Sequence, residues 1–438
     1  MPVVRGLRVL LRIGDFRRLL TVRLLSQAAD GVYQVALASY VVFSPEKQTS
    51  AAAIAAAMAV LLLPYSLLGP FAGVLLDRWR RRQVLLYGNL ARVVLAAGTA
   101  ALIVAEVPDA LFYVSALTVT AVNRFVLAGL SAALPRVVAT DEQLVLGNSL
   151  SPTAGTLAAT AAGGLALVVR MAAPDGAASD ALVILLGSAL YLCAAFAALR
   201  MPRDLLGPDP HQLQPRPNQA LLSTARGLLS GLRHLTRRPA AARALYAMTL
   251  MRFCYGALTV MVLMLCRYAW GDGDSDGLAL LGLAVGISGV GFFVAAVCTP
   301  WAVARFGPLG WVAACGATAA VLEPVLGLPF TPAPMMVAAF FLGLTTQGAK
   351  IATDTIVQSS IEDAYRGRVF SLYDVLFNVA FVGAAGVAAL MLPPDGASTP
   401  LVLIVAALYL AAVSLVVFHV KHDRPRADVS RETERRFT

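Results

Sequence analysis

The chain has 438 residues, of which 58% are hydrophobic and 14% are charged. Soluble domains carry about 45–50% apolar and about 25% charged residues. The apolar residues form blocks of roughly 20 or more, the length that crosses a bilayer core of about 30 Å. This composition indicates a multi-pass membrane protein and excludes a soluble enzyme and a disordered chain. The net charge of +10 does not indicate nucleic-acid binding, because the basic residues lie mainly in short loops between the blocks.

Twelve apolar blocks are expected to form helices, because every backbone group in lipid must be hydrogen-bonded internally. Loops rich in proline, glycine and aspartate separate them, such as 393–396. The predicted helices cover residues 19–43, 51–76, 84–105, 110–134, 144–169, 181–199, 244–268, 278–304, 309–328, 333–359, 369–392 and 399–420.

A polar stretch at 200–243 divides the twelve helices into six plus six. We therefore expect an N-terminal segment (1–18), a six-helix bundle (19–199), a linker (200–243), a second bundle (244–420) and a tail (421–438). The linker begins with several prolines. Its end, 221–238, has apolar residues at helical spacing together with arginines, which fits either a basic helix on the membrane surface or a solvated linker helix.

The distribution of basic residues predicts the orientation. Of the 35 Arg and Lys residues, 28 fall on one side of the predicted helices and 3 on the other. Cytoplasmic loops carry the excess of Lys and Arg. Both termini and the linker are therefore expected in the cytoplasm, with the chain in the inner (plasma) membrane.

The two halves share a faint repeat. Asp30-Gly31 in the first predicted helix corresponds to Tyr255-Gly256 in the seventh, and each pair follows an arginine at the same distance. Together with the six-plus-six count, this indicates two related bundles with a substrate path between them.

The loop between the second and third predicted helices carries the most specific motif. It resembles the signature loop of the major facilitator superfamily, G-x-x-x-D-R-x-x-R-R, although Arg80 stands where the family usually has glycine. The resemblance implies an all-α fold of two six-helix bundles that transports by alternating access, and the arginines can pair with carboxylates of the other bundle or with lipid phosphate. The alternative is a basic loop that only sets topology. The matching residues are Gly73, Asp77, Arg78, Arg81 and Arg82.

Two further stretches resemble a branch of this superfamily that includes enterobactin exporters and macrolide efflux proteins. One runs from Asp15 to Gly31, and the other is the run that begins at Arg366-Gly367-Arg368. The antiporter motif of the fifth helix is only partly present, because Gly155 and Gly163-Gly164 match but Thr160 stands where proline is usual. The plain alternative is that these glycines only allow close helix packing.

Four charged residues lie inside predicted helices one, four, seven and ten, each about 12–16 Å from the cytoplasmic end at about 1.5 Å per residue. Intramembrane charges are costly and are functional candidates by default. The resemblance implies that these four helices line a central cavity, and polar neighbours extend the same helix faces. The predicted substrate cavity comprises Gln27, Asp30, Gln34, Asn123, Arg124, Arg252, Tyr255, Gln347 and Lys350.

Asp30 is the predicted proton carrier, because a carboxyl group in a partly dehydrated cavity can bind and release a proton. Arg92 is predicted to be a rim or packing residue. Three cations against one central acid favour an anionic or zwitterionic substrate. The alternative is that these charges form ion pairs that only hold helices together.

A cytoplasmic gate is expected near the signature loop. Lys350 and Asp354 are spaced for an ion pair. Asp354 and Asp374 could instead be partners of the Arg78 or Arg366 loops, or purely structural. The predicted gate adds Asp354, Arg366, Arg368 and Asp374 to the signature residues.

These features predict a secondary-active transporter, most simply a proton-coupled exporter of a small amphipathic compound such as a drug, secondary metabolite or siderophore. An importer or lipid-handling transporter is the alternative, and an integral-membrane enzyme or receptor is the remote one. No P-loop is present, the cysteines lack metal-ligand spacing and the histidines form no catalytic pair. We therefore expect no metal, cofactor or catalytic residue. The expected partners are the substrate, the proton and the bilayer, with no nucleic acid, and the chain is expected to be a monomer.

Overall fold

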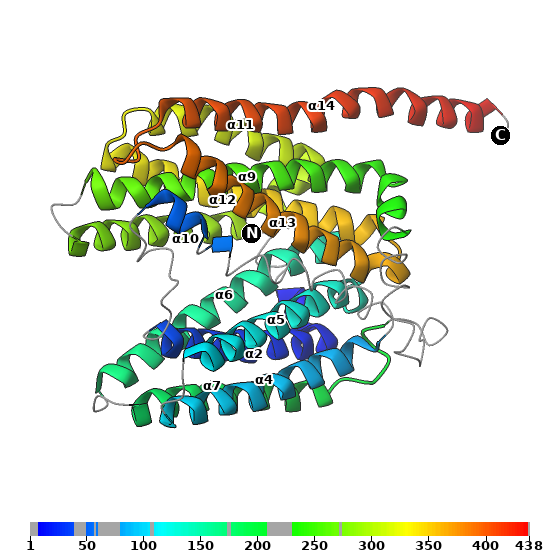
Figure 1. Cartoon of the computed structure of the whole chain (residues 1–438). Coiled ribbons are helices and arrows are strands. Elements are labelled where there is room, and N and C mark those ends of the chain that lie inside the picture. Colours follow the sequence, from blue (N-terminus) through cyan, green and yellow to red (C-terminus); the bar gives the residue numbers. More distant parts are fainter. Residues whose placement is uncertain are drawn as a thin grey trace. The chain divides into compact units, whose positions relative to one another are not determined.

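The computed structural model describes residues 8–38, 50–56, 58–59, 79–105, 109–172, 177–207, 230–270 and 274–436. These residues are nearly all helical and include no strand (Figure 1). The long helices are α2 (Gly14–Ala38), α4 (Arg81–Val104), α5 (Asp109–Ala133), α6 (Asp141–Ala172), α7 (Ala177–Leu199), α9 (Pro239–Tyr268), α10 (Asp274–Phe306), α11 (Pro308–Gly327), α12 (Pro332–Ser360), α13 (Asp363–Met391) and α14 (Thr399–Arg436), with a short 3₁₀ helix η2 (Leu134–Arg136) after α5.

These helices correspond to eleven of the predicted spans. Of the remaining one, 51–76, only 51–56 and 58–59 lie within the described residues, and they are helical. In the described parts of the chain, nine helices are long and apolar enough to cross a membrane. The helices α2 and α6 are not among them. Charged side chains occur along α2, which holds Arg17, Arg18, Arg23 and Asp30.

Some helix ends differ from the prediction for local reasons. Proline is favoured in the first turn of a helix because it has no N–H to leave unpaired. Pro239 accordingly starts α9 five residues before the predicted position. Gly307, with φ of 73°, separates α10 from α11, and this left-handed conformation favours glycine. The last helix runs past its predicted end at 420 and continues to Arg436.

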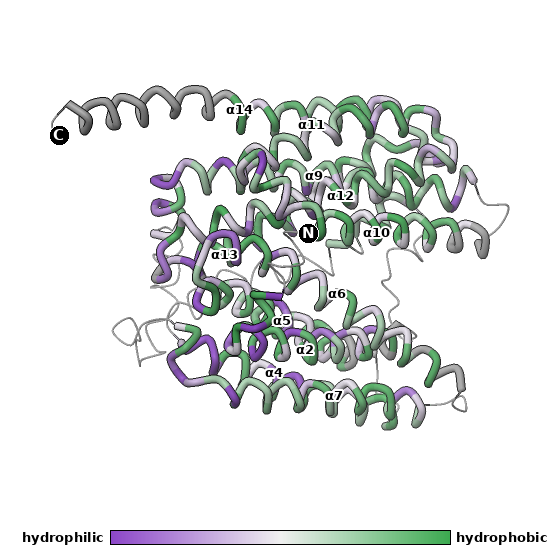
Figure 2. Tube along the Cα trace, turned by 180° about the vertical axis from the view of Figure 1, so that it is seen from behind, coloured by the Kyte–Doolittle hydropathy of each residue, from purple (hydrophilic) through white to green (hydrophobic). Residues whose placement is uncertain are grey.

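The burial pattern is that of a protein surrounded by lipid. Val94, Leu165 and Leu390 are exposed, whereas Arg81 and Arg92 are fully buried. Apolar side chains outside and charges inside are expected where the solvent is hydrocarbon. Figure 2 shows helices that are predominantly hydrophobic over much of their length.

The chain forms two compact units. The first comprises Met1–Thr49, Ala56–Arg237 and Gln358–Val379, and the second comprises Ser50–Ala55, Arg238–Val357 and Ala380–Thr438. The first unit thus takes in a segment, Gln358–Val379, that the predicted division at the linker assigns to the second bundle.

Glycines bring helices into close contact in both units. In the first unit, α4 packs on α7, and α2 packs on α6 and α7. Gly31 of α2 lies against the backbone of Ala159 in α6, where a Cβ would collide, and Gly163 lies against the Gly31 carbonyl. In the second unit, a Cβ on Gly256 would lie 2.9 Å from the Phe381 carbonyl oxygen of α13. The two glycines of the predicted repeat therefore occupy equivalent roles at helix contacts.

Because of this close packing, adding one methyl group at Gly31 is expected to have a large effect on stability. Gly31→Ala is expected to lower the free energy of unfolding by about 1–3 kcal/mol, the usual cost of overpacking, because the obstacle is backbone that cannot rotate away. Gly164→Ala is the matched control, because nothing lies within 4 Å of its added Cβ. Thermal unfolding of the purified variants measures the difference, and equal melting temperatures would contradict the close packing.

Candidate functional site

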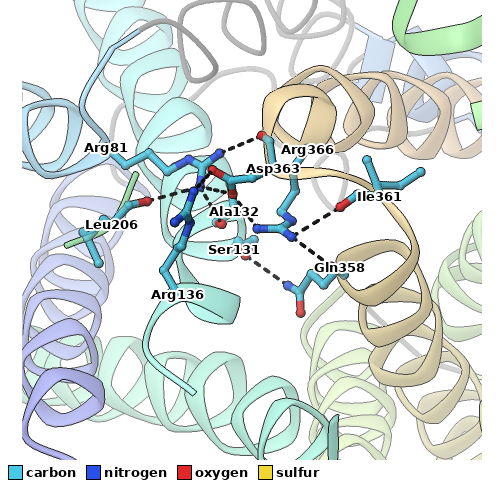
Figure 3. Close-up of polar contacts among 9 residues, drawn as sticks. All are labelled: Arg81, Ser131, Ala132, Arg136, Leu206, Gln358, Ile361, Asp363 and Arg366. Carbon is cyan, nitrogen blue, oxygen red and sulfur yellow. Dashed lines mark hydrogen bonds and ion pairs between the residues drawn. The ribbon is translucent and has the colours of Figure 1, made fainter. Parts of the chain in front are cut away.

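Three arginines converge on one carboxylate in the first unit, and we refer to Arg81, Arg136, Asp363 and Arg366 as the Asp363 cluster (Figure 3). Asp363 Oδ1 accepts hydrogen bonds from Arg81 Nη1 at 2.9 Å and from Arg366 Nη1 at 2.6 Å. Its Oδ2 accepts one from Arg136 Nη2 at 2.7 Å. The Arg81 side chain is 0% exposed and that of Asp363 is 14% exposed. The cluster is thus largely removed from solvent.

Secondary structure sets these positions. Arg81 begins α4, Arg136 ends η2, and Asp363 begins α13 with Arg366 one turn later. Asp363 and Arg366 follow the linker in the chain, whereas Arg81 and Arg136 precede it. The cluster therefore joins segments that are far apart in the sequence.

Backbone carbonyls add to the coordination of Arg81. Its Nη1 also donates to the carbonyl oxygens of Ala132 and Leu206, each at 3.1 Å, and its Nη2 donates to that of Asp363 at 3.3 Å. Buried guanidinium groups are costly unless their donors are paired. The many hydrogen bonds of Arg81 indicate a specific buried site rather than an incidental surface contact.

A neutral hydrogen-bond chain lies beside the cluster. Asn148 Nδ2 donates to Gln358 Oε1 at 2.6 Å, and Gln358 Nε2 donates to the Ser131 carbonyl at 3.0 Å. Arg366 Nη2 donates to the carbonyl oxygens of Gln358 and Ile361. These bonds tie the end of α12 to α5 and α6 at the same place.

The charges of the cluster keep Asp363 ionised. Burial raises the pKa of Asp363, but the hydrogen bond from Arg136 and the charges of Arg81 and Arg366 outweigh it and hold that pKa below the ordinary aspartate value. The carboxylate is therefore present throughout the physiological range.

This lowered pKa predicts a pH dependence. A group whose pKa falls on folding contributes stability above its unfolded pKa, and that contribution disappears as the pH drops through the folded pKa. The difference in melting temperature between the wild type and Asp363→Asn is thus expected to be constant from pH 8 to about pH 5 and to shrink below about pH 4. A difference that already shrinks between pH 7 and pH 5 would contradict this assignment.

Of the residues that match the signature loop, the structure describes the last two arginines. Arg81 belongs to the Asp363 cluster. Arg82 donates to the carbonyl oxygens of Ala198 and Leu199 near the end of α7, at 3.2 and 3.1 Å. Gly73, Asp77 and Arg78 lie outside the described residues.

Arg366 and Arg368 of the predicted gate both lie in the first turns of α13. Arg366 Nη1 binds Asp363 Oδ1, one turn earlier on that helix, at 2.6 Å. Arg368 instead donates to Ser230 Oγ at 3.1 Å and lies over the Tyr365 ring. The sequence analysis missed Asp363. The available signal was an acid three residues before Arg366, the spacing of an ion pair within one helix.

A second buried ionic site surrounds Asp30. Its Oδ1 accepts hydrogen bonds from Arg92 Nη1 at 2.9 Å and from the Tyr191 hydroxyl at 2.6 Å. Asp30 is 6% exposed and Arg92 is 0% exposed. Arg92 also donates to the side-chain oxygens of Ser26, Asn89 and Asn123. The site thus links α2, α4, α5 and α7.

The prediction for Arg92 was a rim or packing residue, and its burial fits a packing residue. Since α4 begins at Arg81 rather than at 84, Arg92 lies three turns into the helix, and its guanidinium group is buried over the Tyr191 ring at 4.4 Å. It is the charge partner of the predicted proton carrier.

The other predicted cavity residues fall into separate contacts. Lys350 Nζ contacts Asp354 Oδ2 at 2.7 Å, which is the pairing expected from their spacing. Arg124 Nη1 lies 3.9 Å from Asp374 Oδ1. Within the second unit, the Arg252 guanidinium lies over the rings of Phe381 and Tyr255, at 4.3 and 5.1 Å.

The uncharged cavity candidates differ in exposure. Gln27 lies against Gly155 and its Oε1 is buried, Gln347 is half-buried and Gln34 is exposed. The meeting of Asp30, Arg124, Arg252 and Lys350 in one cavity stays a prediction.

Membrane-length helices with buried, paired charges between them are the features of an integral membrane protein. The sequence matches the Major Facilitator Superfamily over residues 19–322. Two uncharacterized MFS-type transporters, from Mycobacterium bovis and Mycobacterium tuberculosis, are each 36% identical over 400 residues, which cover 91% of this chain and 90% of theirs. The chain belongs to the major facilitator superfamily, and it is a transporter rather than an enzyme.

Solved structures show the same fold. A bacterial homologue of the iron transporter ferroportin, in an outward-facing state, superposes with a TM-score of 0.70 at 16% identity, covering 92% of this chain and 98% of its own. The transporter FucP in the outward conformation gives 0.66 at 16% identity, with coverage of 93% and 98%. The human organic anion transporter MFSD10 gives 0.68 at 14% identity, with coverage of 92% and 99%. The predicted all-α major facilitator fold is confirmed.

Proposed function

We propose that this transporter is a proton-coupled exporter of a small amphipathic compound and works by alternating access. Asp30 carries the proton, and the Asp363 cluster opens and closes once in each cycle. The chain's motifs resemble those of the branch with enterobactin exporters and macrolide efflux proteins. The chain is a monomer in the inner membrane. Both of its termini lie in the cytoplasm.

The Asp30 site is the observation that carries the proposal. A buried carboxylate paired with a buried arginine inside membrane helices costs desolvation energy that apolar packing would avoid. Charges kept at such a cost mark ion or proton pathways. Two donors on one carboxylate oxygen, from Arg92 and Tyr191, stabilise the carboxylate of Asp30 after its proton has left.

The Asp363 cluster supplies the conformational element. Ion pairs that tie Arg81 and Arg136 to a segment beyond the linker stabilise one arrangement of the helices. Transporters of this type alternate by moving one bundle against the other, which requires such contacts to break and re-form.

The cargo class follows from the balance of charges. Of the three cations behind the expected excess of positive charge, Arg124 and Lys350 each lie near an aspartate, and Arg252 lies over aromatic rings. This weakens the preference for an anion and favours an amphipathic compound, in keeping with the apolar lining described below.

The test is uptake of a compound panel into inverted membrane vesicles with an imposed gradient, acidic inside. An exporter exchanges luminal protons for external compound, so at least one compound should accumulate above its level without the gradient. Vesicles that hold the Asp363→Asn variant control for passive trapping of weak bases. Equal accumulation in both kinds of vesicle, or gradient-driven uptake only into right-side-out vesicles, would overturn the proposal.

A further inference from the structure

The second unit encloses a cavity between α9, α10, α11 and α12. Its volume is about 220 Å³, and most of its lining is apolar, including Leu258, Val262, Phe292, Ala338 and Leu342. Cavities of this character bind small molecules, with a few polar groups that set orientation. Val285 and Gly289 belong to the lining and are exposed, so a small ligand reaches the cavity past α10.

One acidic side chain faces this apolar space. Glu323 of α11 lines the cavity and is 4% exposed, and its Oε1 is buried with no hydrogen-bond partner among the described residues. The lining residues that the structure describes include no arginine, lysine or histidine. Its electrostatic neighbours, Cys254 and Tyr409, supply no positive charge.

This isolation distinguishes Glu323 from Asp30, Asp354 and Asp363. Asp30 and Asp363 each have arginine partners, and Asp354 has Lys350. A buried charged group is stable only when it is paired and hydrogen-bonded. Glu323 therefore lacks a cationic N–H donor within the described residues. A ligand can supply this donor.

The geometry points to a binding site for a lipophilic organic amine, in which Glu323 accepts a hydrogen bond from the protonated amine and the apolar lining contacts its hydrocarbon body. The sequence analysis did not single out Glu323. The site needs neither a transport direction nor a coupling ion, so it can hold or fail independently of the proposed export. A carboxylate ligand cannot form this ion pair with Glu323.

Isothermal titration of the full chain in lipid nanodiscs at pH 7.5 tests the site, with empty nanodiscs as the blank for lipid partitioning. The probes are 4-phenylbutylamine, 4-phenylbutan-1-ol and 4-phenylbutyrate, which share a body and differ in the polar end. We expect saturable binding of the amine, with the alcohol and the acid about tenfold weaker or more. Glu323→Gln should weaken the amine about tenfold and leave the alcohol unchanged.

A second pair of variants tests the cavity without removing the charge. A Cβ at Gly289 or at Gly286 meets nothing within 4 Å, and only Gly289 belongs to the lining. Gly289→Val should weaken amine binding by filling the space, whereas Gly286→Val, one turn earlier on α10, should not. This pair decides the question if Glu323→Gln does not fold. Amine binding that is unaffected by both Glu323→Gln and Gly289→Val, or no stronger than alcohol binding, would overturn the inference.

Discussion

Replacing Asp363 by asparagine is expected to lower the free energy of unfolding by about 3–5 kcal/mol and to reduce transport about tenfold or more. The amide cannot neutralise three guanidinium groups, and Arg81 has no exposed surface through which water could compensate. The arrangement of helices that the Asp363 cluster stabilises would then be poorly populated. Thermal unfolding and vesicle transport measure the two effects.

Asp204→Asn is the matched control for this variant. Asp204 also pairs with an arginine, Arg80, at 2.7 Å, but its side chain is 54% exposed. Exposed ion pairs contribute about 0–1 kcal/mol. We therefore expect nearly unchanged stability and transport. Equal losses in the two variants would show that burial of the Asp363 cluster has no special importance.

Asp30→Asn is expected to abolish proton-driven transport. The amide cannot take up and release the proton, so a pH gradient no longer drives the cycle. The variant should also lose about 3–5 kcal/mol of stability, because Arg92 stays buried without its counter-charge. Purified protein in proteoliposomes separates the effects, since exchange of labelled for unlabelled compound needs no proton.

The double variant Asp30→Asn/Arg92→Gln separates coupling from folding. Removing both members of a buried pair is often neutral for stability. We expect most of the lost stability to return while gradient-driven transport stays absent. A double variant that is still driven by the gradient would reduce the Asp30 site to a structural ion pair.

The sequence predicted the helices well because hydrocarbon imposes a length and a composition on each span. The ends were less predictable. The charged first turn of α4 and the acid that begins α13 lie outside the apolar blocks, so their helical state depends on capping and tertiary contacts. This is why the predicted start of α4 was three residues late.

The sequence predicted many residues of the candidate sites, but it did not predict which residues on different helices form ion pairs. Lys350 and Asp354 lie on one helix, so their spacing alone predicted the contact. Asp30 with Arg92, and Arg81 with Asp363, lie on different helices, and a single sequence contains no information on which helix faces pack together. Glu323 was overlooked because one acid in an apolar helix has no spacing pattern.

The opening of the Asp363 cluster during transport is the central claim, and a reversible cross-link beside it gives the most direct test. Asn148 and Gln358 hydrogen-bond at 2.6 Å next to the cluster. Asn148→Cys/Gln358→Cys would be introduced after the five native cysteines are replaced by alanine, and joined by a short bis-methanethiosulfonate. We predict that cross-linking stops transport and that reduction restores it. Undiminished transport by the cross-linked protein would contradict the account.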